Sequence, residues 1–389
     1  MTSSAANGMT NGTTTDSAAG GTASAASATT AATAGSAASA APTAHRMRLI
    51  CVEEHALSAP LARASGPVAG RSAPYLAGWG SRVTDGLHAE GATSPHVIAK
   101  DVSARKLMDL GQARLADMDA AGIDMQVLSI GGFPQLAPPR EQNDLTRQAN
   151  DLLAGAVAEH PDRFAALAAL PWHDPDAAAA ELRRAVTDLG MHGTLLNGRP
   201  GETFLDDSRY DVVLAALAEL GVPIYLHPGL LAPGAAEAYY SGFDEEIDAR
   251  LAMFGWGWHH EAGVGVVRLI LSGAFERHPG LQVISGHWGE MVPFFLRRLD
   301  DALPREATGL ERTILETYRS HVSVTPSGML NPEQLAFCVA LLGAERILFS
   351  TDYPYQSLDG VRAYLESADL TEAQRAAIAH GNAERLLGL

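Results

Sequence analysis

The chain has 389 residues, and its 45 acidic against 28 basic side chains give a net charge of −17. Nucleic acid and anionic membrane surfaces would be repelled by this charge, so neither is an expected partner. No run of about 18 apolar residues occurs, which excludes a membrane-spanning helix. Cys51 and Cys338 are too few for a disulfide scaffold, and this favours a reducing, cytoplasmic location with both thiols in the core.

The first 45 residues differ in composition from the rest of the chain. They contain one acidic residue, Asp16, no Lys or Arg, and otherwise mostly Ala, Ser, Thr and Gly. Such a stretch cannot bury a core, and it has neither the basic and apolar regions of a secretory signal nor the arginines of a mitochondrial presequence. We therefore predict a disordered low-complexity tail over residues 1–45 and a folded domain over residues 46–389.

Beyond residue 46, short apolar runs typical of buried β-strands alternate with longer amphipathic helical patterns. The eight predicted strands are Leu49–His55, Met125–Ile130, Phe164–Pro171, Gly193–Gly198, Pro223–Pro228, Leu281–His287, His321–Ser327 and Ile347–Pro354. The predicted helices include Asp174–Leu189, Ser208–Leu220, Val264–Arg277, Asn331–Leu342 and Asp359–Ser367, with apolar residues at three- and four-residue spacing. Eight βα units predict an α/β fold of the (β/α)8 barrel type, with the active site at the carboxyl ends of the strands. A doubly wound open sheet is the alternative, but no glycine-rich phosphate loop follows the first strand.

Two connections are longer than a minimal barrel needs, namely residues 56–103 and 229–262. Long insertions of this kind usually cap or shape a site. The second is rich in aromatic and histidine side chains: Tyr239, Tyr240, Phe243, Phe254, Trp256, Trp258, His259 and His260. A flat, partly apolar substrate would suit such walls, but the same aromatic residues could instead pack the insertion against the barrel or a second subunit.

Polar residues at the strand ends indicate a metal site. Side chains alternate along a strand, so Glu53 and His55 project to one side and Glu54 to the other, although a register shift of one residue would exchange the two carboxylates. His227 ends the fifth strand and Asp352 the eighth. Two carboxylates and two imidazoles suit one divalent ion, Zn2+ or Mn2+, and the sequence does not choose between them. A salt bridge at the barrel rim is the alternative role for either glutamate.

Six segments carry a resemblance to a known family. They are Val52-Glu53-Glu54-His55, His160-Pro161-Asp162-Arg163-Phe164, Tyr225-Leu226-His227-Pro228, Leu271-Ser272-Gly273 with Phe275-Glu276-Arg277-His278-Pro279, Ser285-Gly286-His287-Trp288-Gly289-Glu290, and Phe349-Ser350-Thr351-Asp352-Tyr353-Pro354. With these segments, residues 49–389 resemble the amidohydrolase-related decarboxylases, which include aminocarboxymuconate-semialdehyde, gamma-resorcylate and dihydroxybenzoate decarboxylases. Glu rather than His at the first motif position resembles the branch that acts on hydroxybenzoates.

The resemblance implies roles for individual residues. It implies that Glu53, His55, His227 and Asp352 bind the metal ion. It also implies that His287 is the catalytic histidine, that Glu290 is its structural partner, and that Arg298 helps to hold the substrate. Further candidates for substrate contact are Asn197 and His173, at the ends of the fourth and third strands, and Trp288, beside His287.

These roles predict a non-oxidative decarboxylase of a small aromatic hydroxy acid, with the acid oriented by the metal ion and Asp352 as the proton donor to the ring. No organic cofactor is expected. The enzymatic alternative is a hydrolase of a lactone or amide that uses a metal-activated water, and a non-catalytic barrel used for binding is a third reading. The expected partners are a small-molecule carboxylic acid and further copies of the chain, in a homodimer or higher homo-oligomer.

Overall fold

Parallel strands lie at the centre of the fold. The computed structural model describes residues 46–82 and 96–389, so the tail predicted over residues 1–45 lies outside the described residues. The strands are β1 (Ile50–Ala56), β2 (Met125–Ile130), β3 (Phe164–Ala166), β4 (Thr194–Asn197), β5 (Ile224–His227), β6 (Val283–Ser285) and β7 (Val322–Val324). They form a three-stranded sheet in the order β1-β2-β3 and a four-stranded sheet in the order β4-β5-β6-β7. Every pairing within these sheets is parallel.

Isolated bridges connect the two sheets into a barrel. A parallel bridge between Ala168 and Thr194 joins the end of β3 to β4. The predicted eighth strand, over residues 347–354, is not a regular strand, but its two ends bridge to both neighbours, at Val324 of β7 and Glu54 of β1. Eight sequence-adjacent segments therefore close in order, as the (β/α)8 barrel prediction required, and the barrel fold is confirmed by the comparisons given below.

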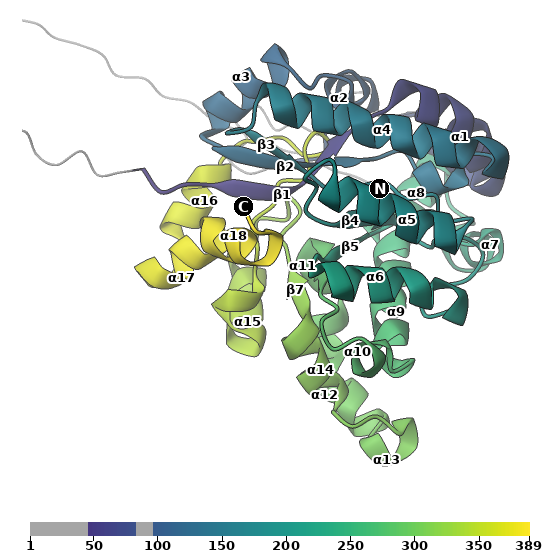
Figure 1. Cartoon of the computed structure of the whole chain (residues 1–389), viewed down its shortest axis with the longest axis vertical. Helices are drawn as coiled ribbons and strands as arrows, with labels where there is room; N and C mark the ends of the chain where they lie inside the picture. Colours follow the sequence, from purple (N-terminus) through teal and green to yellow (C-terminus); the bar gives the residue numbers. More distant parts are fainter. Residues whose placement is uncertain (1–45, 83–95) are drawn as a thin grey trace, which may run out of the picture. The chain divides into compact units, whose positions relative to one another are not determined.

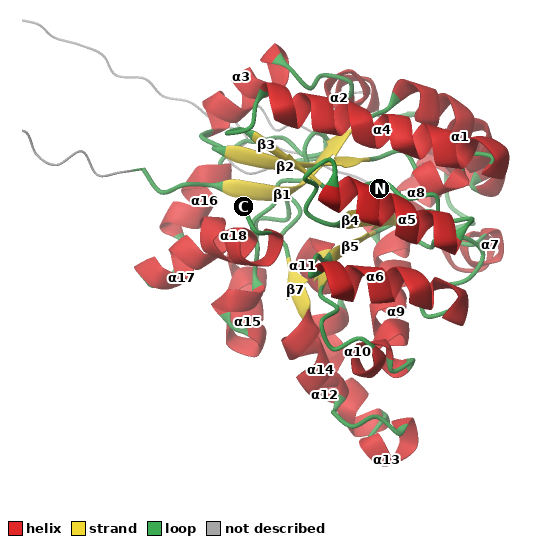
Figure 2. Cartoon of the chain, in the orientation of Figure 1, coloured by secondary structure: helices red, strands yellow, loops and turns green. Residues whose placement is uncertain are grey.

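Helices surround the strands, as Figures 1 and 2 show. They are α1 (Ala59–Ser72), α2 (Lys100–Leu107), α3 (Gln112–Ala121), α4 (Pro139–Glu159), α5 (Pro175–Thr187), α6 (Asp211–Leu220), α7 (Pro233–Tyr240), α8 (Glu245–Arg250), α9 (Gly257–Leu271), α10 (Ala274–Arg277), α11 (Gly286–Glu290), α12 (Val292–Ala302), α13 (Arg305–Thr308), α14 (Ile314–His321), α15 (Pro332–Leu342), α16 (Val361–Ser367), α17 (Glu372–Ala376) and α18 (Asn382–Leu387). Shorter turns of helix are η1 (Pro74–Gly78), η2 (Pro134–Leu136), η3 (Ser208–Tyr210), η4 (Leu251–Gly255), η5 (Ala344–Arg346) and η6 (Ala377–Gly381).

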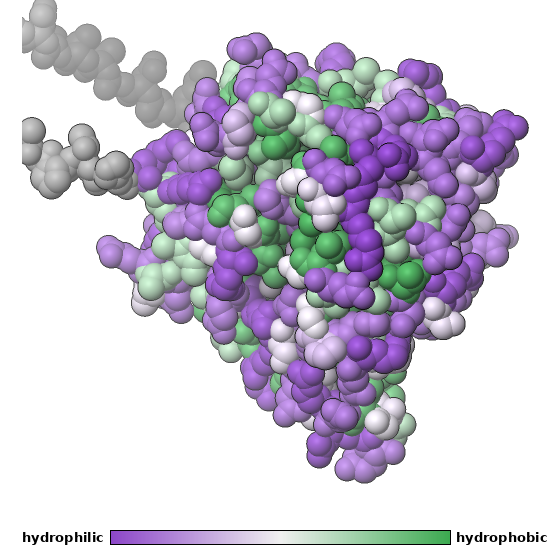
Figure 3. Space-filling model, viewed as in Figure 1, coloured by the Kyte–Doolittle hydropathy of each residue, from purple (hydrophilic) through white to green (hydrophobic). Residues whose placement is uncertain are grey.

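Apolar side chains fill two layers, one inside the barrel and one between the strands and the helices. The inner cluster includes Ile50 and Val52 of β1, and the outer one includes Cys51. Hydrophilic residues cover most of the face shown in Figure 3, and apolar residues show mainly in its middle. Among the described residues, no helix has the length and apolar character needed to cross a membrane. Both cysteines are buried and unpaired, and burial raises the pKa of each thiol.

A bulge in β1 changes which residues face the barrel interior. The register with β2 shifts between Cys51 and Glu54, so that three steps along β1 oppose two steps along β2. Without the bulge, strict alternation from the buried Ile50 and Val52 would turn Glu54 inward. Because of the bulge, Glu53 and His55 face the interior instead.

Where the structure describes them, the two long connections fold largely as helices over the mouth of the barrel. Residues 56–103 supply α1, η1 and the start of α2, and residues 229–262 supply α7, α8, η4 and the start of α9. The buried carboxylate of Glu246 in α8 accepts hydrogen bonds from the backbone N–H groups of Gly80 and Arg82. The second connection therefore holds the first in place.

Candidate metal centre and active site

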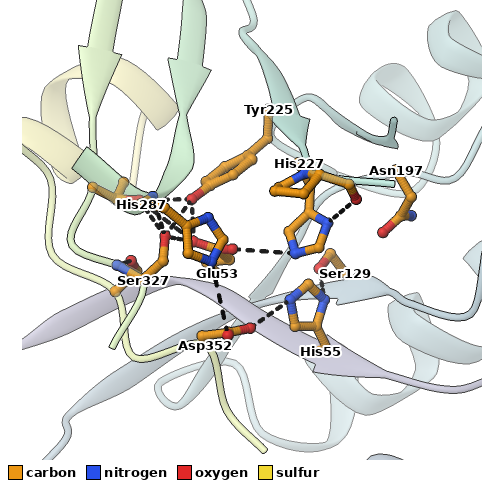
Figure 4. Close-up of polar contacts among 12 residues, drawn as sticks. Glu53, His55, Ser129, Asn197, Tyr225, His227, His287, Ser327 and Asp352 are labelled. Atoms are coloured by element: carbon orange, nitrogen blue, oxygen red, sulfur yellow. Dashed lines mark hydrogen bonds and ion pairs between the residues drawn. The ribbon is translucent and has the colours of Figure 1, made fainter. Parts of the chain in front are cut away.

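Side chains from three segments that are far apart in the sequence converge at the carboxyl ends of the strands. One ligand atom from each of Glu53, His55, His227 and Asp352 can be chosen so that all four lie within 4.8 Å of one another. His227 Nε2 is 3.3 Å from Glu53 Oε1, and His55 Nε2 is 3.2 Å from Asp352 Oδ1. Figure 4 shows these groups around a common space. The structure thus brings together the four residues predicted as ligands.

Hydrogen bonds hold Glu53 by one oxygen only. Its Oε2 accepts hydrogen bonds from the hydroxyl groups of Tyr225 in β5 and of Ser327 and Thr325 beyond β7. Its Oε1 is buried and has no hydrogen-bond partner. The carboxylate is therefore fixed in an orientation that leaves one oxygen free to bind a cation.

The two imidazoles are oriented in the same way. His227 Nδ1–H donates to the carbonyl oxygen of Pro228 over 2.7 Å, which leaves the Nε2 lone pair facing Glu53. Burial lowers the pKa of His227 well below its usual value, so its ring is neutral. His55 Nδ1 lies 3.3 Å from the Ser129 hydroxyl, and its Nε2 faces Asp352. Neutral imidazoles with a fixed second nitrogen are the form that binds metal ions.

Buried polar atoms without hydrogen-bond partners indicate whether a metal ion fits at this site. Glu53 Oε1, His55 Nε2 and Asp352 Oδ1 are all buried without a hydrogen-bond partner, and all three belong to the four-residue cluster. Unpaired polar atoms are costly to bury, and a bound cation would satisfy all three at once. Two nitrogen and two carboxylate ligands fit a divalent ion such as Zn2+ or Mn2+.

Glu54 points to the opposite side of β1, between the barrel and its helices. It accepts hydrogen bonds from the side chain of Gln126 over 3.2 Å and from Thr351, whose N–H and hydroxyl lie at 2.9 and 2.6 Å. Burial raises the pKa of Glu54 to about 8. Its place is structural, and it takes no part in the four-residue cluster.

His287 lies beside this cluster on a left-handed turn. The five residues from His287 to Met291 all have positive φ, between 46° and 80°, so β6 ends at Ser285 rather than at the predicted His287. A β-carbon on Gly289 would lie 2.4 Å from the Tyr318 hydroxyl, so only glycine fits there. The turn is tied down by hydrogen bonds from His287 N–H to Ser327 and from Trp288 N–H to the Thr325 carbonyl.

This turn puts Glu290 against His287. His287 Nδ1–H donates to Glu290 Oε1 over 2.8 Å, and His287 Nε2 lies 3.9 Å from Asp352 Oδ2. Burial lowers the pKa of His287, but the negative charges of Glu290 and Glu53, together with the nearby carboxylate of Asp352, outweigh it and hold this pKa well above its usual value. Burial raises the pKa of Asp352, but His287 and His55 together hold it well below the usual range. The pair therefore carries its proton on His287.

A cavity of about 170 Å³ opens beside these groups. Its described lining contains His55, His227, Asp352 and His287 together with a mostly apolar and aromatic wall: Leu76, Trp79, Val97, Ile98, Phe133, Met253, Phe254, Trp258, Met329 and Tyr355. Both long connections contribute to this wall. Among the lining residues that the structure describes, none is Lys or Arg.

The other candidates for substrate contact differ in position. Asn197 lines the cavity, with its amide N–H donating to the Ile130 carbonyl. Trp288 is buried behind the left-handed turn and donates its indole N–H to the Met329 carbonyl, outside the cavity lining. His173 is exposed and binds the side chain of Gln142.

Arg298 is outside the described lining of the cavity in its own chain, so its implied contact with the substrate stays a prediction. The apolar face of α12, with Val292 and Leu296, is buried, and α12 packs against α9 and α14. Arg298 projects from the opposite face, where its side chain is 75% exposed and pairs with Asp301. The spacing between His287 and Arg298 in the sequence does not predict which face of α12 carries the arginine.

The roles of several residues of the site could not be read from the sequence. Tyr225, Thr325 and Ser327 fix Glu53 through hydroxyl groups, which are common in strands and turns. His259 binds Glu290 over 2.8 Å although it is 31 residues away in sequence. The aromatic insertion was a signal for cavity walls, but not for this contact.

A parallel barrel with a divalent-metal ligand set at the carboxyl ends of its strands defines a metal-dependent barrel enzyme. The family model described as "Amidohydrolase" matches residues 96–389, and the chain belongs to this family. A curated relative, gamma-resorcylate decarboxylase of a Rhizobium species, is 36% identical over 299 residues, which cover 73% of this chain and 89% of that protein.

Solved structures give the same result. The chain is similar to 2,6-dihydroxybenzoate decarboxylase in complex with 2,6-dihydroxybenzoate, with a TM-score of 0.73, 31% identity, and coverage of 88% of this chain and 99% of that one. It is also similar to a dihydroxybenzoic acid decarboxylase from a Polaromonas species with bound manganese and 2-nitroresorcinol, with a TM-score of 0.73 and 29% identity. That second match covers 88% of this chain and 98% of the other.

Proposed function

We propose that this protein is a metal-dependent, non-oxidative decarboxylase of a small aromatic hydroxy acid. One observation carries the proposal: three unpaired buried ligand atoms converge beside the His287–Asp352 pair, at the edge of a cavity with aromatic walls. The similarity to decarboxylases whose structures hold 2,6-dihydroxybenzoate or manganese supports both the reaction and the ion.

In this proposal Glu53, His55, His227 and Asp352 hold one divalent ion, Zn2+ or Mn2+. When bound, the ion supplies positive charge that orients the anionic acid and offsets its charge. Glu290 holds His287 in place through its Nδ1–H. The ion and the acid are the only non-protein components that the reaction needs.

The proton for the ring carbon comes from the His287–Asp352 pair. An anionic substrate beside Asp352 raises the affinity of this carboxylate for a proton, which His287 Nε2 donates across the 3.9 Å that separates the two groups. Asp352 then delivers the proton to the ring carbon that carries the carboxylate. The bond to the carboxylate breaks, its electron pair restores the aromatic ring, and carbon dioxide leaves. Solvent returns a proton to His287.

The cavity wall favours an acid with a single carboxylate. The described lining contains no Lys or Arg, so a second carboxylate would be desolvated without a counter-charge. Trp79, Phe254 and Trp258 offer flat apolar surface to a ring, and Asn197 offers an amide to a ring hydroxyl. Contact of Arg298, His173 or Trp288 with the substrate has no support in the geometry of this chain.

We further propose that the chain forms a homodimer or higher homo-oligomer. Trp256, Phe294, Phe295 and Phe337 line one surface groove, and the Phe294 side chain is 77% exposed. Monomeric proteins seldom expose contiguous aromatic patches of this kind. Light scattering of the wild-type chain and of Phe294→Ser tests this proposal, because the substitution should shift the chain toward monomer.

The buried, unpaired cysteines support a cytoplasmic location.

The decarboxylase proposal is tested with protein loaded with Mn2+ or Zn2+. A panel of mono- and dicarboxylated phenols is followed for carbon dioxide release, and a parallel panel of lactones and amides is followed for hydrolysis. We expect carbon dioxide and the corresponding phenol from monocarboxylated substrates. Turnover of lactones or amides alone would instead identify a hydrolase.

A further inference from the structure

Two histidines, not one, bind the carboxylate of Glu290. His287 Nδ1–H donates to Oε1 and His259 Nδ1–H donates to Oε2, each over 2.8 Å. The two rings lie close together, with 4.4 Å between their centroids. Glu290 is fully buried, and although burial raises its pKa, the two imidazoles hold this pKa below its usual value.

His259 is itself held from both sides. With Nδ1–H on Glu290, the lone pair of its Nε2 accepts a hydrogen bond from the indole N–H of Trp258 over 3.1 Å, and the carbonyl oxygen of Phe254 would be the partner only of a protonated Nε2. His259 and both of these neighbours line the cavity, and all three residues belong to the second long connection. His259 is therefore part of the cavity wall and also binds Glu290.

The need for a second donor follows from the geometry of the carboxylate. A carboxylate held by a single hydrogen bond can rotate about its bond to the side chain and swing away from His287. His259 fixes the second oxygen, and so it fixes the plane in which the first oxygen receives His287 Nδ1–H. With Nδ1 fixed, His287 Nε2 stays directed at Asp352.

We propose that His259 is a positioning residue for the reaction, acting through Glu290 to hold the ring of His287 in its working orientation. His259 is not among the four proposed ligands of the metal ion. The expected effect on turnover rests on the decarboxylase function proposed above. The hydrogen bonds that His259 and His287 donate to Glu290 do not depend on that function, and they can be measured without a substrate.

The kinetic test compares His259→Leu, which removes the donor, with His259→Asn, whose amide can replace the Nδ1–H. His260→Leu is the matched control, because this neighbour is exposed and outside the cavity lining. We expect His259→Leu to lower kcat roughly tenfold to a hundredfold, with KM and metal content within about twofold of wild type. His259→Asn should restore most of the rate, and His260→Leu should match wild type. Unchanged kcat in His259→Leu would overturn the proposal.

A double-mutant cycle tests whether His259 acts through Glu290. In a Glu290→Gln background, His259→Leu should cause little further loss of kcat, because the carboxylate it orients is already gone. Fully additive losses would show that His259 acts by another route. If His259→Leu does not fold, His259→Phe keeps a ring of similar shape without the donor and replaces it in the cycle.

The measurement without substrate uses proton NMR of the zinc-loaded protein. The downfield Nδ1–H resonances of His259 and His287 are distinguished from those of other hydrogen-bonded histidines, such as His227, by their loss in His259→Asn and His287→Asn. In His259→Phe, the resonance of His287 should shift or broaden as its carboxylate partner becomes mobile. An unchanged His287 resonance would show that His259 does not position His287 through Glu290. If no acid is decarboxylated at all, the proposed function fails, but this spectrum still tests the positioning role of His259.

Discussion

The adjacent carboxylates Glu53 and Glu54 occupy opposite environments, although they have the same chemistry. Glu53 presents an unpaired oxygen to two imidazoles, and Glu54 is satisfied by hydrogen bonds from Gln126 and Thr351. The side of β1 from which each carboxylate projects therefore decides whether its replacement affects metal binding or the stability of the fold.

We expect Glu53→Gln to lower metal occupancy severalfold, because an amide is a weaker ligand than a carboxylate. Glu54→Gln should keep the metal ion but lose about 1–3 kcal/mol of stability, since its amide N–H₂ would face the N–H₂ of Gln126 and the Thr351 hydroxyl proton. Elemental analysis and urea unfolding measure the two effects. Loss of the ion in Glu54→Gln rather than in Glu53→Gln would mean that the bulge in β1 is misplaced by one residue.

Asp352 combines two proposed roles, and one substitution separates them. Asp352→Asn should reduce turnover by roughly 10²–10⁴-fold even after reloading with metal, because an amide can coordinate weakly but cannot deliver a proton. His287→Asn should keep its metal and lose rate as well. Turnover is compared at equal metal content. Near-normal activity of Asp352→Asn at full occupancy would exclude Asp352 as the proton donor.

At the scale of elements, the cavity wall depends on two insertions that hold each other. η1 and the residues after it supply Leu76 and Trp79, and the segment from η4 to α9 supplies Phe254 and Trp258. Gly78 and Glu245 pack so closely that a β-carbon on Gly78 would lie 2.1 Å from the Glu245 carbonyl oxygen. The substrate pocket is therefore an interface between insertions, supported by the barrel beneath it.

We expect Glu246→Ala to raise KM several-fold while leaving metal content unchanged. The substitution removes the acceptor for the N–H groups of Gly80 and Arg82, and this loosens the wall around Trp79 without touching the barrel. The matched control is Glu245→Ala, at the exposed neighbouring position of α8. Steady-state kinetics on both variants provides the measurement. Equal KM values for the two variants would argue against this link between the insertions.

At the scale of the whole molecule, the ion should stabilise the fold as well as serve the reaction. Glu53 Oε1, His55 Nε2 and Asp352 Oδ1 are buried and have no hydrogen-bond partner. Chelation should abolish turnover and lower Tm, with binding at a thousandfold excess over Kd contributing about 4 kcal/mol. Calorimetry of the chelated protein and of protein reloaded to about one ion per chain checks this. Failure to reload near one equivalent would refute the mononuclear site.

The domain boundary proposed at residue 46 predicts that deleting residues 1–45 leaves turnover and Tm nearly unchanged. The reason is compositional, since Ala, Ser, Thr and Gly supply too little apolar surface to join a core. The truncated and full-length chains are compared at equal metal loading. A large fall in either quantity would show that this segment contributes to the domain or its site.

Much of this architecture could be predicted from periodicity. The run Met125–Ile130 is β2 without any change in bounds, and the predicted helix Asn331–Leu342 differs from α15 by one residue. Apolar runs flanked by amphipathic stretches determine such elements locally. The eighth strand was the least regular, because Asp352 has a φ of 56° and only the ends of its segment bridge to the neighbouring strands.

The sequence by itself determined the alternation of strands and helices and the residue types at the strand ends, because both depend on neighbours within a few positions. Only the tertiary structure decided which side chains face one another. The bulge that turns Glu53 inward, the left-handed turn that puts Glu290 on His287, and the exposed face of α12 that carries Arg298 all depend on contacts between distant segments. The contact of His259 with Glu290 exists only because an insertion folds back over the barrel. No local sequence pattern predicts how that insertion folds.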